Sequence, residues 1–400
     1  MKKDWEVKKL GDVCELMNGY AFQSKQYTDE GYFVIRIGNV QDGYIELNNP
    51  RYIKLNEERQ KKFILQSGDI LISLTGNVGR VGAVQEEHLP AVLNQRVAKI
   101  AIKKDQSTAK EYLLYFLTSE YFISELIKAG RGAAQQNIST TDIENLEIPL
   151  PHLSEQQRIV AILDEAFAAI AKAKANAEQN LKNAKELFES YLQGVFENGN
   201  WERKTVGEVA QHSLGKMLDK NKNKGILQKY LRNQSVRWFE FDLNDLTEMP
   251  FLENENEKFT AIKGDVLICE GGYPGRAAIW QEDYPIYFQK AIHRVRFNKA
   301  EYNKWFLYYL FLLDRTDKLK AHFTGTGIQH FTGQVLNKLP MPIPPLGKVT
   351  ALVKKLDALS AETKKIEAIY QQKINDLEEL KKSVLQKAFS GELKTATALV

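Results

Sequence analysis

Cysteine is scarce in this sequence, with only Cys14 and Cys269 among 400 residues. The two lie far apart and form neither a CxxC pair nor a Cys/His cluster, which argues against a disulfide framework and favours reduced thiols. The six histidines show no metal-binding spacing either. We therefore expect a cytoplasmic protein without a structural metal.

Long apolar runs are also missing. No stretch approaches the roughly 20 apolar residues that a membrane-spanning helix needs. The first residues, MKKDWEVKKLGDV, carry charge without the apolar segment of a secretory signal. The composition, 43% hydrophobic and 26% charged, is ordinary for a globular protein, and 400 residues exceed what a single core usually supports. We expect two or more domains and no membrane partner.

A strong excess of charge of one sign is absent as well, because the formal net charge is +4. Residues 1–153 contain 19 Lys and Arg against 20 Asp and Glu, whereas residues 201–346 contain 21 against 17. A polyanionic partner such as DNA would therefore be bound by local basic patches rather than by an overall positive field.

What the sequence does contain is an internal duplication. WEVKKLGDV (5–13) reappears as WERKTVGEV (201–209), an offset of 196 that also relates Phe63, Gly68, Asp69, Gly76, Gly79 and Arg80 to Phe259, Gly264, Asp265, Gly272, Gly275 and Arg276. Further along the offset is 193, where Gln136 matches Gln329 and LEIPLP (146–151) matches LPMPIP (339–344). An ordered series over nearly 200 residues indicates two similar domains rather than a solenoid of short repeats.

Each repeat is typical of a mixed α/β domain followed by a long helix. SGDILISLTGNVGRVGAV (67–84) and KGDVLICEGGYPGRAAIW (263–280) have short β-rich runs broken by glycines. Helical patches follow at 109–128 and 303–313, and the proline-punctuated connectors IPLPHLSE (148–155) and MPIPPLGK (341–348) close the domains. We predict an α/β (α+β) fold with similar domains at 1–150 and 199–345, a first long helix at 151–198, and a second long helix with a C-terminal tail at 346–400.

The two long helices carry a heptad pattern, with apolar residues at alternating steps of three and four. The predicted seam positions are Val160, Leu163, Phe167, Ile170, Leu181 and Phe188 on the first helix, and Leu352, Leu356, Leu359, Ile366, Tyr370 and Leu377 on the second. Two such helices in one chain most simply bury their seams against each other. We therefore expect a coiled-coil scaffold, not a catalytic element.

Duplicated domain-plus-helix units normally pack with approximate two-fold symmetry. If the axis is perpendicular to the helices, the pair is antiparallel and the arrangement is pseudo-two-fold symmetric, with the domains held at a separation set by helix length. In a DNA-binding protein this would fix the spacing of two half-sites.

Glycine-flanked polar loops supply candidate DNA contacts. Arginine pairs with guanine and Gln or Asn with adenine, whereas lysine more often holds phosphate. The candidates of the first domain are Asn77, Arg80, Gln95, Arg96, Arg131, Gln135 and Gln136. Those of the second are Lys216, Tyr273, Arg276, Gln289, Lys290, His322, Gln329 and His330.

Positions that differ between the repeats, such as Asn77 against Tyr273 or Arg131 against Thr324, are the stronger candidates for sequence choice. Arg80 and Arg276 recur in both repeats, which fits a shared phosphate clamp and a fold-supporting ion pair equally well. A lysine-rich segment is either a phosphate-tracking loop, the interpretation we favour, or a solvated surface; its members are Lys216, Lys220, Lys222, Lys224, Lys229 and Arg232.

Motifs for catalysis are missing. The sequence has no G-x-x-x-x-G-K-[ST] phosphate loop. The stretch Asn48-Asn49-Pro50-Arg51 lacks the second proline and the aromatic residue of an adenine methyltransferase motif, and no glycine-rich cofactor loop accompanies it. We expect neither a catalytic residue nor a cofactor in this chain.

The layout resembles a known family. Each half opens with Trp-x-x-x-x-(Leu/Val)-Gly-(Asp/Glu)-Val and closes with a proline-punctuated connector and a long helix, and IPLPHLSEQQ (148–157) is a particularly close match. Over essentially its whole length the chain resembles the specificity subunit of Type I restriction–modification enzymes. The second connector departs from the pattern, because Gly347-Lys348-Val349 replaces the Ser-Glu-Gln of the first.

The resemblance implies two target-recognition domains that read a bipartite, asymmetric target in double-stranded DNA. It also implies partners: two modification (methyltransferase) subunits, which dock on the helices and bring S-adenosylmethionine, and restriction (translocase/nuclease) subunits, which bring ATP- and Mg-dependent chemistry. The recognised sequence, the spacer length and the self-association of the free subunit are left open.

Two other interpretations remain at this point. An enzyme with an unrecognised methyltransferase or nuclease centre would bind a cofactor as the purified chain alone. A coiled-coil adaptor without nucleic-acid contact would show no salt-dependent DNA binding, whereas the affinity of a phosphate-contacting protein falls steeply as salt rises.

Overall fold

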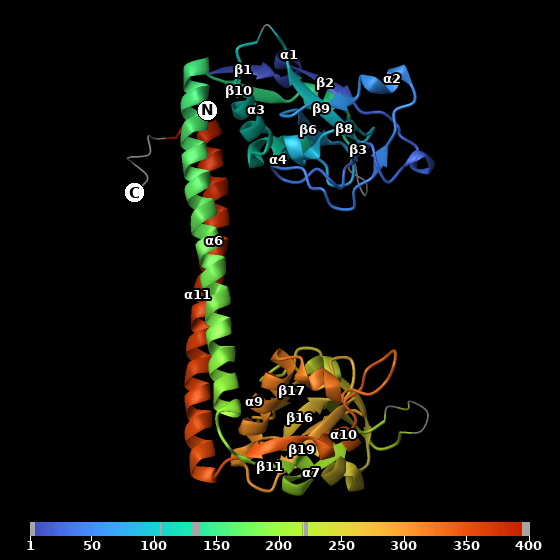
Figure 1. The fold of residues 1–400 in the computed structure, drawn as a ribbon, viewed down its shortest axis with the longest axis vertical. Helices are drawn as coiled ribbons and strands as arrows, with labels where there is room; N and C mark the ends of the chain where they lie inside the picture. Colours follow the sequence, from blue (N-terminus) through green and yellow to red (C-terminus); the bar gives the residue numbers. More distant parts are fainter. Residues whose placement is uncertain (1–4, 105, 130–136, 218, 220–222, 394–400) are drawn as a thin grey trace. The chain divides into compact units, whose positions relative to one another are not determined.

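The computed structural model describes residues 5–104, 106–129, 137–217, 219 and 223–393. Two compact units divide the chain: unit 1 comprises Met1–Ala177 and Gln372–Val400, and unit 2 comprises Glu178–Gln371. Within its described residues, each unit holds two four-stranded sheets, a two-stranded ribbon and part of each long helix (Figure 1).

Unit 1 begins with its ribbon and alternates short strands with short helices. Its strands are β1 (Glu6–Lys9), β2 (Cys14–Asn18), β3 (Tyr32–Ile35), β4 (Tyr52–Ile53), β5 (Ile64–Leu65), β6 (Ile70–Ser73), β7 (Val81–Ala83), β8 (Ala91–Leu93), β9 (Val97–Ile102) and β10 (Glu147–Leu150). Its helices are α1 (Leu10–Val13), η1 (Ser24–Gln26), α2 (Glu58–Lys61), η2 (Glu86–His88), α3 (Lys110–Leu117), α4 (Glu120–Ala129) and α5 (Thr140–Glu144), followed by the long α6 (Leu153–Glu197).

Unit 2 repeats this plan. Its strands are β11 (Glu202–Thr205), β12 (Ala210–Leu214), β13 (Ile226–Leu231), β14 (Thr247–Phe251), β15 (Thr260–Ala261), β16 (Val266–Cys269), β17 (Ala277–Ile279), β18 (Ile286–Phe288), β19 (Ile292–Phe297) and β20 (Pro340–Ile343). Its helices are α7 (Val206–Val209), η3 (Asn233–Ser235), η4 (Glu253–Glu255), α8 (Asn256–Phe259), α9 (Glu301–Arg315), η5 (Lys318–His322), α10 (Gly333–Lys338) and the long α11 (Leu346–Ser390).

The sheets of the two units have the same strand order. In unit 1 the orders are β2-β9-β6-β7 and β4-β3-β8-β5, and in unit 2 they are β12-β19-β16-β17 and β14-β13-β18-β15. Each second sheet contains one parallel pair, β3 with β8 and β13 with β18. The ribbons β1–β10 and β11–β20 also correspond. The duplication in the sequence is therefore a duplication of topology.

The apolar runs of β6 and β16 explain why the first sheet of each unit has a core on both of its faces. Side chains alternate between the faces of a strand, so Ile70 and Ile72 enter the core beneath the helices while Leu71 enters the core shared with the second sheet. In unit 2, Val266 and Ile268 face the helices, and Leu267 and Cys269 face the second sheet. A strand buried on both faces needs a continuous apolar sequence, which ILIS and VLIC provide.

The ends of the long helices belong to the domain cores. In unit 1, Ile159 and Leu163 of α6 share a core with Leu385 and Phe389 of α11. Contacts between the two helices run in opposite sequence directions. Lys381 of α11 lies over the Phe167 ring of α6, and further along α6 Lys174 pairs with the earlier α11 residue Glu378. The segments are therefore antiparallel within unit 1. No helix of the described chain has the length and apolarity needed to cross a membrane.

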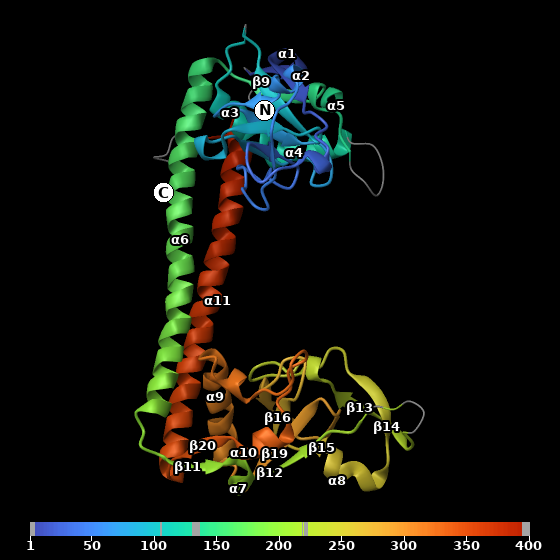
Figure 2. The same ribbon diagram turned by 45° about the vertical axis from the view of Figure 1, so that its right-hand side comes forward.

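In unit 2, α9 lies between the sheets and the long helices (Figure 2). Its Trp305 stacks on Phe196 of α6 with ring centroids 4.1 Å apart and donates from Nε1 to the Pro342 carbonyl at 2.8 Å. This contact ties α6, α9 and β20 together. It also shows that the long helix is part of the folding unit and not an appendage to it.

The predicted seam needs one correction. Ile366 is 40% exposed, because the apolar core of unit 2 includes α11 residues only as far as Leu359. Val160 is half-buried and packs against the core of unit 1, and the adjacent Ile159 is fully buried, because the start of α6 packs on the helices of unit 1 as well as on α11. Leu163, Ile170, Phe188 and Leu356 are buried as the heptad pattern predicted.

Candidate nucleic-acid interface

The parallel strands β3 and β8 determine where polar loops gather in unit 1. Parallel neighbours end at the same edge of a sheet, and loops that follow carboxyl ends of such strands form crevices. Arg36 follows β3 directly, and Asn94, Gln95 and Arg96 follow β8. The backbone fixes their register: the Asn94 amide donates to the Ile35 carbonyl at 3.2 Å, and the Gln95 amide to the Tyr20 carbonyl at 2.9 Å.

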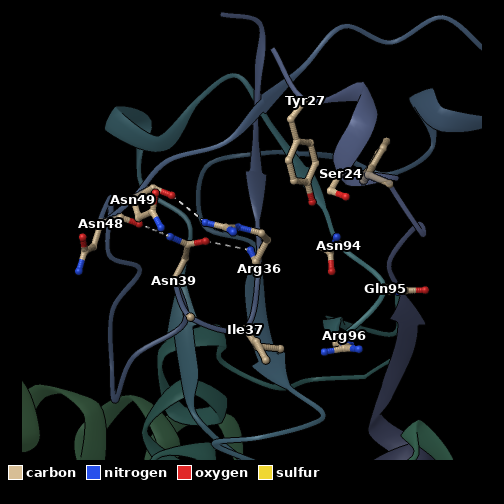
Figure 3. A pocket seen from close by; sticks show the side chains of 12 residues that line it. Ser24, Tyr27, Arg36, Ile37, Asn39, Asn48, Asn49, Asn94, Gln95 and Arg96 are labelled. Atoms are coloured by element: carbon tan, nitrogen blue, oxygen red, sulfur yellow. Dashed lines mark hydrogen bonds between the residues drawn. The ribbon is translucent and has the colours of Figure 1, made fainter. Parts of the chain in front are cut away.

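Asn39 organises the loop after β3. It is 1% exposed, and its Nδ2 donates to the Glu46 and Asn48 carbonyls, at 3.0 Å each. Its Oδ1 accepts the Arg36 amide at 3.1 Å. The Arg36 guanidinium donates from Nη2 to the Asn49 carbonyl at 2.7 Å, so hydrogen bonds connect the start of the loop to its end (Figure 3). A buried amide with this many partners fixes one loop conformation.

These loops enclose a polar cavity of about 620 Å³, which we call the strand-end pocket. Its lining includes Ser24, Tyr27, Arg36, Asn48, Gln95 and Arg96. Ser24 and Tyr27 come from the segment around η1, on the side opposite Asn48 and Asn49 (Figure 3). The exposed side chains of Gln95 and Arg96 bring an amide and a guanidinium to its rim, the groups that pair bidentately with adenine and guanine.

Unit 2 builds the same framework with other side chains. Arg232 follows β13 as Arg36 follows β3, and its Nη2 donates to the Asp245 carbonyl at 3.0 Å and to the Asp245 carboxylate at 2.7 Å. Gln289 and Lys290 follow β18, with backbone bonds from Gln289 N to Leu231 O and from Lys290 N to Lys216 O. The backbone hydrogen bonds that position these loops are therefore the same in both units.

Glycine is needed where β2 and β12 run past these loops. A Cβ at Gly19 would lie 2.2 Å from the Asn94 carbonyl oxygen, and a Cβ at Gly215 would lie 2.2 Å from that of Gln289. Only glycine permits so close an approach of two backbones. The same residue at the same place in both units fixes the position of the loops relative to the neighbouring sheet.

A second pair of loops connects β6 to β7 and β16 to β17. Asn77 is exposed at the first turn, and Tyr273 is 63% exposed at the second. Arg80 donates from Nη1 to Gln41 Oε1 at 2.6 Å and lies 3.9 Å from Asp42. Arg276 donates from Nη2 to the Asn233 carbonyl at 3.1 Å, with its guanidinium 4.0 Å from the Tyr273 ring centroid.

Of the two roles that the sequence allowed for Arg80 and Arg276, the contacts favour fold support. Both guanidinium groups are bound to their own unit, so each orders the turn that carries the exposed side chain. In unit 2 the consequence is specific, because Arg276 lies against the Tyr273 ring and holds it as a fixed aromatic surface.

Lys216 requires a correction. Its side chain is buried, its ammonium pairs with Glu255 and donates to the Pro250 carbonyl at 3.0 Å, and it lies 4.9 Å from the Phe251 ring centroid. A buried ammonium with these partners holds the segment that follows β12 against β14 and is unavailable to phosphate. Its pairing also removes it from the lysine-rich segment proposed as a phosphate-tracking loop, of which Lys220 and Lys222 lie outside the described residues.

The remaining candidates fall into three groups. Arg131, Gln135 and Gln136 lie outside the described residues. Gln329 and Lys290 are exposed, and Gln289 is half-buried. His322 ends η5 and is half-buried, while the His330 ring packs against Gly271, where an added Cβ would lie 3.1 Å from its Nδ1. His330 therefore joins its loop to the turn that carries Tyr273.

Sequence reasoning named the segment Asn94–Arg96, but it missed Ser24, Tyr27, Arg36 and Asn39 as residues of the strand-end pocket. One signal was available, since Arg36 and Arg232 obey the offset of 196 that relates the repeats. The Asn48–Asn49 pair stood out only as an incomplete methyltransferase motif. In the fold its backbone carbonyls accept from Asn39 and Arg36, which gives these residues a place in the loop framework.

Burial decides the protonation state of the groups beneath the loops. It raises the pKa of Cys14 to about 12 and that of Cys269 to about 11, the latter against an opposing effect of Arg276. Both thiols are therefore protonated near neutral pH and are weak nucleophiles. Burial, reinforced by the nearby His212, lowers the pKa of His293 to about 4. This imidazole is therefore uncharged near neutral pH.

Comparison with known proteins identifies the family. The model of the Type I restriction modification DNA specificity domain matches residues 2–182 and again residues 198–379. The chain belongs to this family. It is 23% identical to the putative type I restriction enzyme MjaX specificity subunit of Methanocaldococcus jannaschii over 99% of this chain and 95% of that protein. It is also 23% identical to the EcoKI specificity subunit of Escherichia coli over 98% of this chain and 90% of that protein.

Solved structures share the fold. One, reported for complex assembly and conformational transition of the type I R-M system, aligns over 98% of this chain and 99% of that chain with a TM-score of 0.79 at 19% identity. The HsdS subunit from Thermoanaerobacter tengcongensis aligns over 98% of both chains with a TM-score of 0.58 at 18% identity. The prediction of a DNA specificity subunit with two target-recognition domains, a recognition subunit and not a catalytic one, is confirmed by the family match.

Proposed function

We propose that each unit reads one half of a bipartite, asymmetric target in double-stranded DNA through the loops at the carboxyl ends of its parallel strands. The observation that carries this proposal is one backbone framework present twice with different side chains. Gln95 and Arg96 in unit 1 correspond to Lys290 and Ala291 in unit 2. The two units therefore share the backbone geometry of these loops and differ in the side chains that the loops present. Two such domains can bind DNA in the same way and prefer different base sequences.

The chemistry of the strand-end pocket supports base reading in unit 1. A guanidinium presents a planar donor pair to the O6 and N7 of guanine, and an amide presents a donor and an acceptor to adenine. Arg36 is already bound to Asn49, so it supports the loop, while Arg96 is exposed and has the freedom to meet a base. We assign Arg96 and Gln95 the direct contacts and Arg36 a positioning role.

The long helices serve assembly in this proposal. Specificity subunits of type I systems work with modification and restriction subunits. We propose that two modification subunits dock on α6 and α11 in the cytoplasm and bring S-adenosylmethionine, and that restriction subunits bring ATP and Mg. Leu187 and Ile369, 66% and 64% exposed on these helices, are apolar groups outside the cores that suit docking. The helices would also set the gap between the half-sites.

Arg96→Ala tests the reading role. In the complex with modification subunits, we expect this variant to lose on the order of 10-fold or more in affinity for its target, the effect of losing one good bidentate base contact. Discrimination at one base pair should disappear. Loss of a phosphate contact would instead weaken binding about equally for all sequences and would reduce the salt dependence of the affinity. The measurement is a competition titration at several salt concentrations.

Lys104→Ala is the matched control. Lys104 is also an exposed cation, and it lies beyond the opposite end of β9 from Arg96. Its removal should leave affinity and discrimination unchanged. Equal behaviour of the two variants would contradict the placement of the reading face, and the absence of salt-dependent DNA binding by the natural chain would favour the adaptor alternative.

A further inference from the structure

A short hairpin at residues 324–330 stands out from the sheets of unit 2 (orange in Figure 1). Thr324 and His330 exchange both backbone hydrogen bonds, N to O at 2.9 Å and 2.8 Å, as in an antiparallel ribbon. Gly325 has a φ of +105°, and a Cβ there would lie 2.3 Å from the Ile328 carbonyl oxygen. The tip can fold only because that position is glycine.

The base of this hairpin is fixed to the first sheet. The Phe331 amide donates to the Glu270 carbonyl at 2.7 Å, directly after β16, and the Phe331 ring is fully buried. His293 on β19 lies 3.0 Å from the Phe331 carbonyl through Nε2. The His330 ring packs on Gly271. A loop closed by one antiparallel bridge and anchored at its base presents its tip at a defined place, next to the turn that carries Tyr273.

Ile328, near the tip, is 75% exposed. An isoleucine kept in water forgoes most of the stabilisation that burial would give it. Thr326 and Gln329 beside it are exposed and polar, so this tip combines one apolar group with hydrogen-bonding neighbours. That combination suits a surface that is itself mixed, with a methyl group beside donors and acceptors.

We propose that this hairpin enters the major groove of the half-site read by unit 2 and that Ile328 contacts the C5-methyl group of a thymine. The inference rests on the proposed function. The major groove admits a two-stranded β-ribbon, and it is the groove in which thymine exposes its methyl group. Gln329 is then placed to hydrogen-bond a neighbouring base edge, and Tyr273 lies beside the ribbon on the turn that His330 contacts.

Uracil substitution tests this contact, because uracil keeps the pairing of thymine and lacks only the methyl group. The natural chain, assembled with its modification subunits, is titrated with duplexes in which each thymine of that half-site is replaced singly. One replacement should weaken binding about fourfold, the effect of losing one methyl-sized apolar contact. Ile328→Ala should weaken binding to the thymine duplex at least as much and show no further loss on the uracil duplex.

Ile262→Ala is the control for this experiment. Ile262 is also exposed, and it precedes β16, whereas the hairpin is anchored after β16. This variant should keep the full uracil effect. The proposal is overturned if no thymine is sensitive, if Ile328→Ala retains the sensitivity, or if Ile328→Ala loses assembly with modification subunits while DNA discrimination is intact. Absence of any sequence preference in the natural complex would instead refute the proposed function itself.

Discussion

Replacing residues 1–150 with the same region of another family member is expected to change one half of the methylated target and leave the other half unchanged. All strands of this segment pair within it. Its first strand, β1, pairs with its last, β10, so that Glu6 lies opposite Leu150. All loops of the strand-end pocket travel with it. Because specific sites are preferred over others by on the order of 10³-fold or more, the change should be complete rather than graded. Methylation sequencing of cells that carry the exchanged chain measures it.

The donor of residues 1–150 must keep the apolar side chains that pack against the long helices in the core of unit 1. Tyr112 and Phe116 of α3 contact Phe389 of α11, with ring centroids 5.3 Å and 5.4 Å apart. A donor without bulky apolar groups there would leave a cavity and a destabilised unit. The reciprocal exchange, of residues 201–346, should change the other half of the target. Altered preference in both halves after a single exchange would contradict the assignment of one half to each unit.

Phe196→Ala is expected to destabilise unit 2 by about 3–5 kcal/mol, the cost of truncating a buried phenylalanine. Phe196 is 7% exposed and packs against the rings of Trp305 and Tyr309, at centroid distances of 4.1 Å and 5.4 Å. Its loss would separate the end of α6 from α9. Chemical unfolding followed by tryptophan fluorescence measures the change in the free energy of unfolding.

Leu187→Ala is the matched control on the same helix. Leu187 is 66% exposed, so its truncation should change the free energy of unfolding by no more than about 0.5 kcal/mol. If Phe196→Ala were as mild, the long helix would be a separable spacer and not part of the domain core. That outcome would contradict the fold described for unit 2.

The duplication made the fold predictable. Repeated glycines, the proline connectors and the heptads are local signals, and together they indicate two α/β domains with antiparallel helices. Local signals do not report which face of a helix a distant element covers. For that reason the heptad pattern included Ile366, which the core does not reach, and omitted Ile159, which is fully buried beside Val160.

The site was less predictable, because its contacts join residues that are distant in sequence. Lys216 was predicted to contact phosphate, but its ammonium pairs with Glu255, which is 39 residues away in the sequence. Arg36 recurs as Arg232 at the repeat offset, but the sequence does not show that its partner is the backbone carbonyl of Asn49. Gln95 and Arg96 were candidates because they lie in a polar segment whose side chains suit base edges. The parallel pairing that brings them beside Arg36 is not visible in the sequence.

Methylation mapping most directly tests the claim that one chain carries two readers. The natural chain is expressed with its modification partner in a host without other adenine methylation, and every methylated adenine is located. The account predicts a single motif with two specified parts separated by an unspecified gap of constant length. A continuous short motif, or methylation without sequence preference, would contradict it.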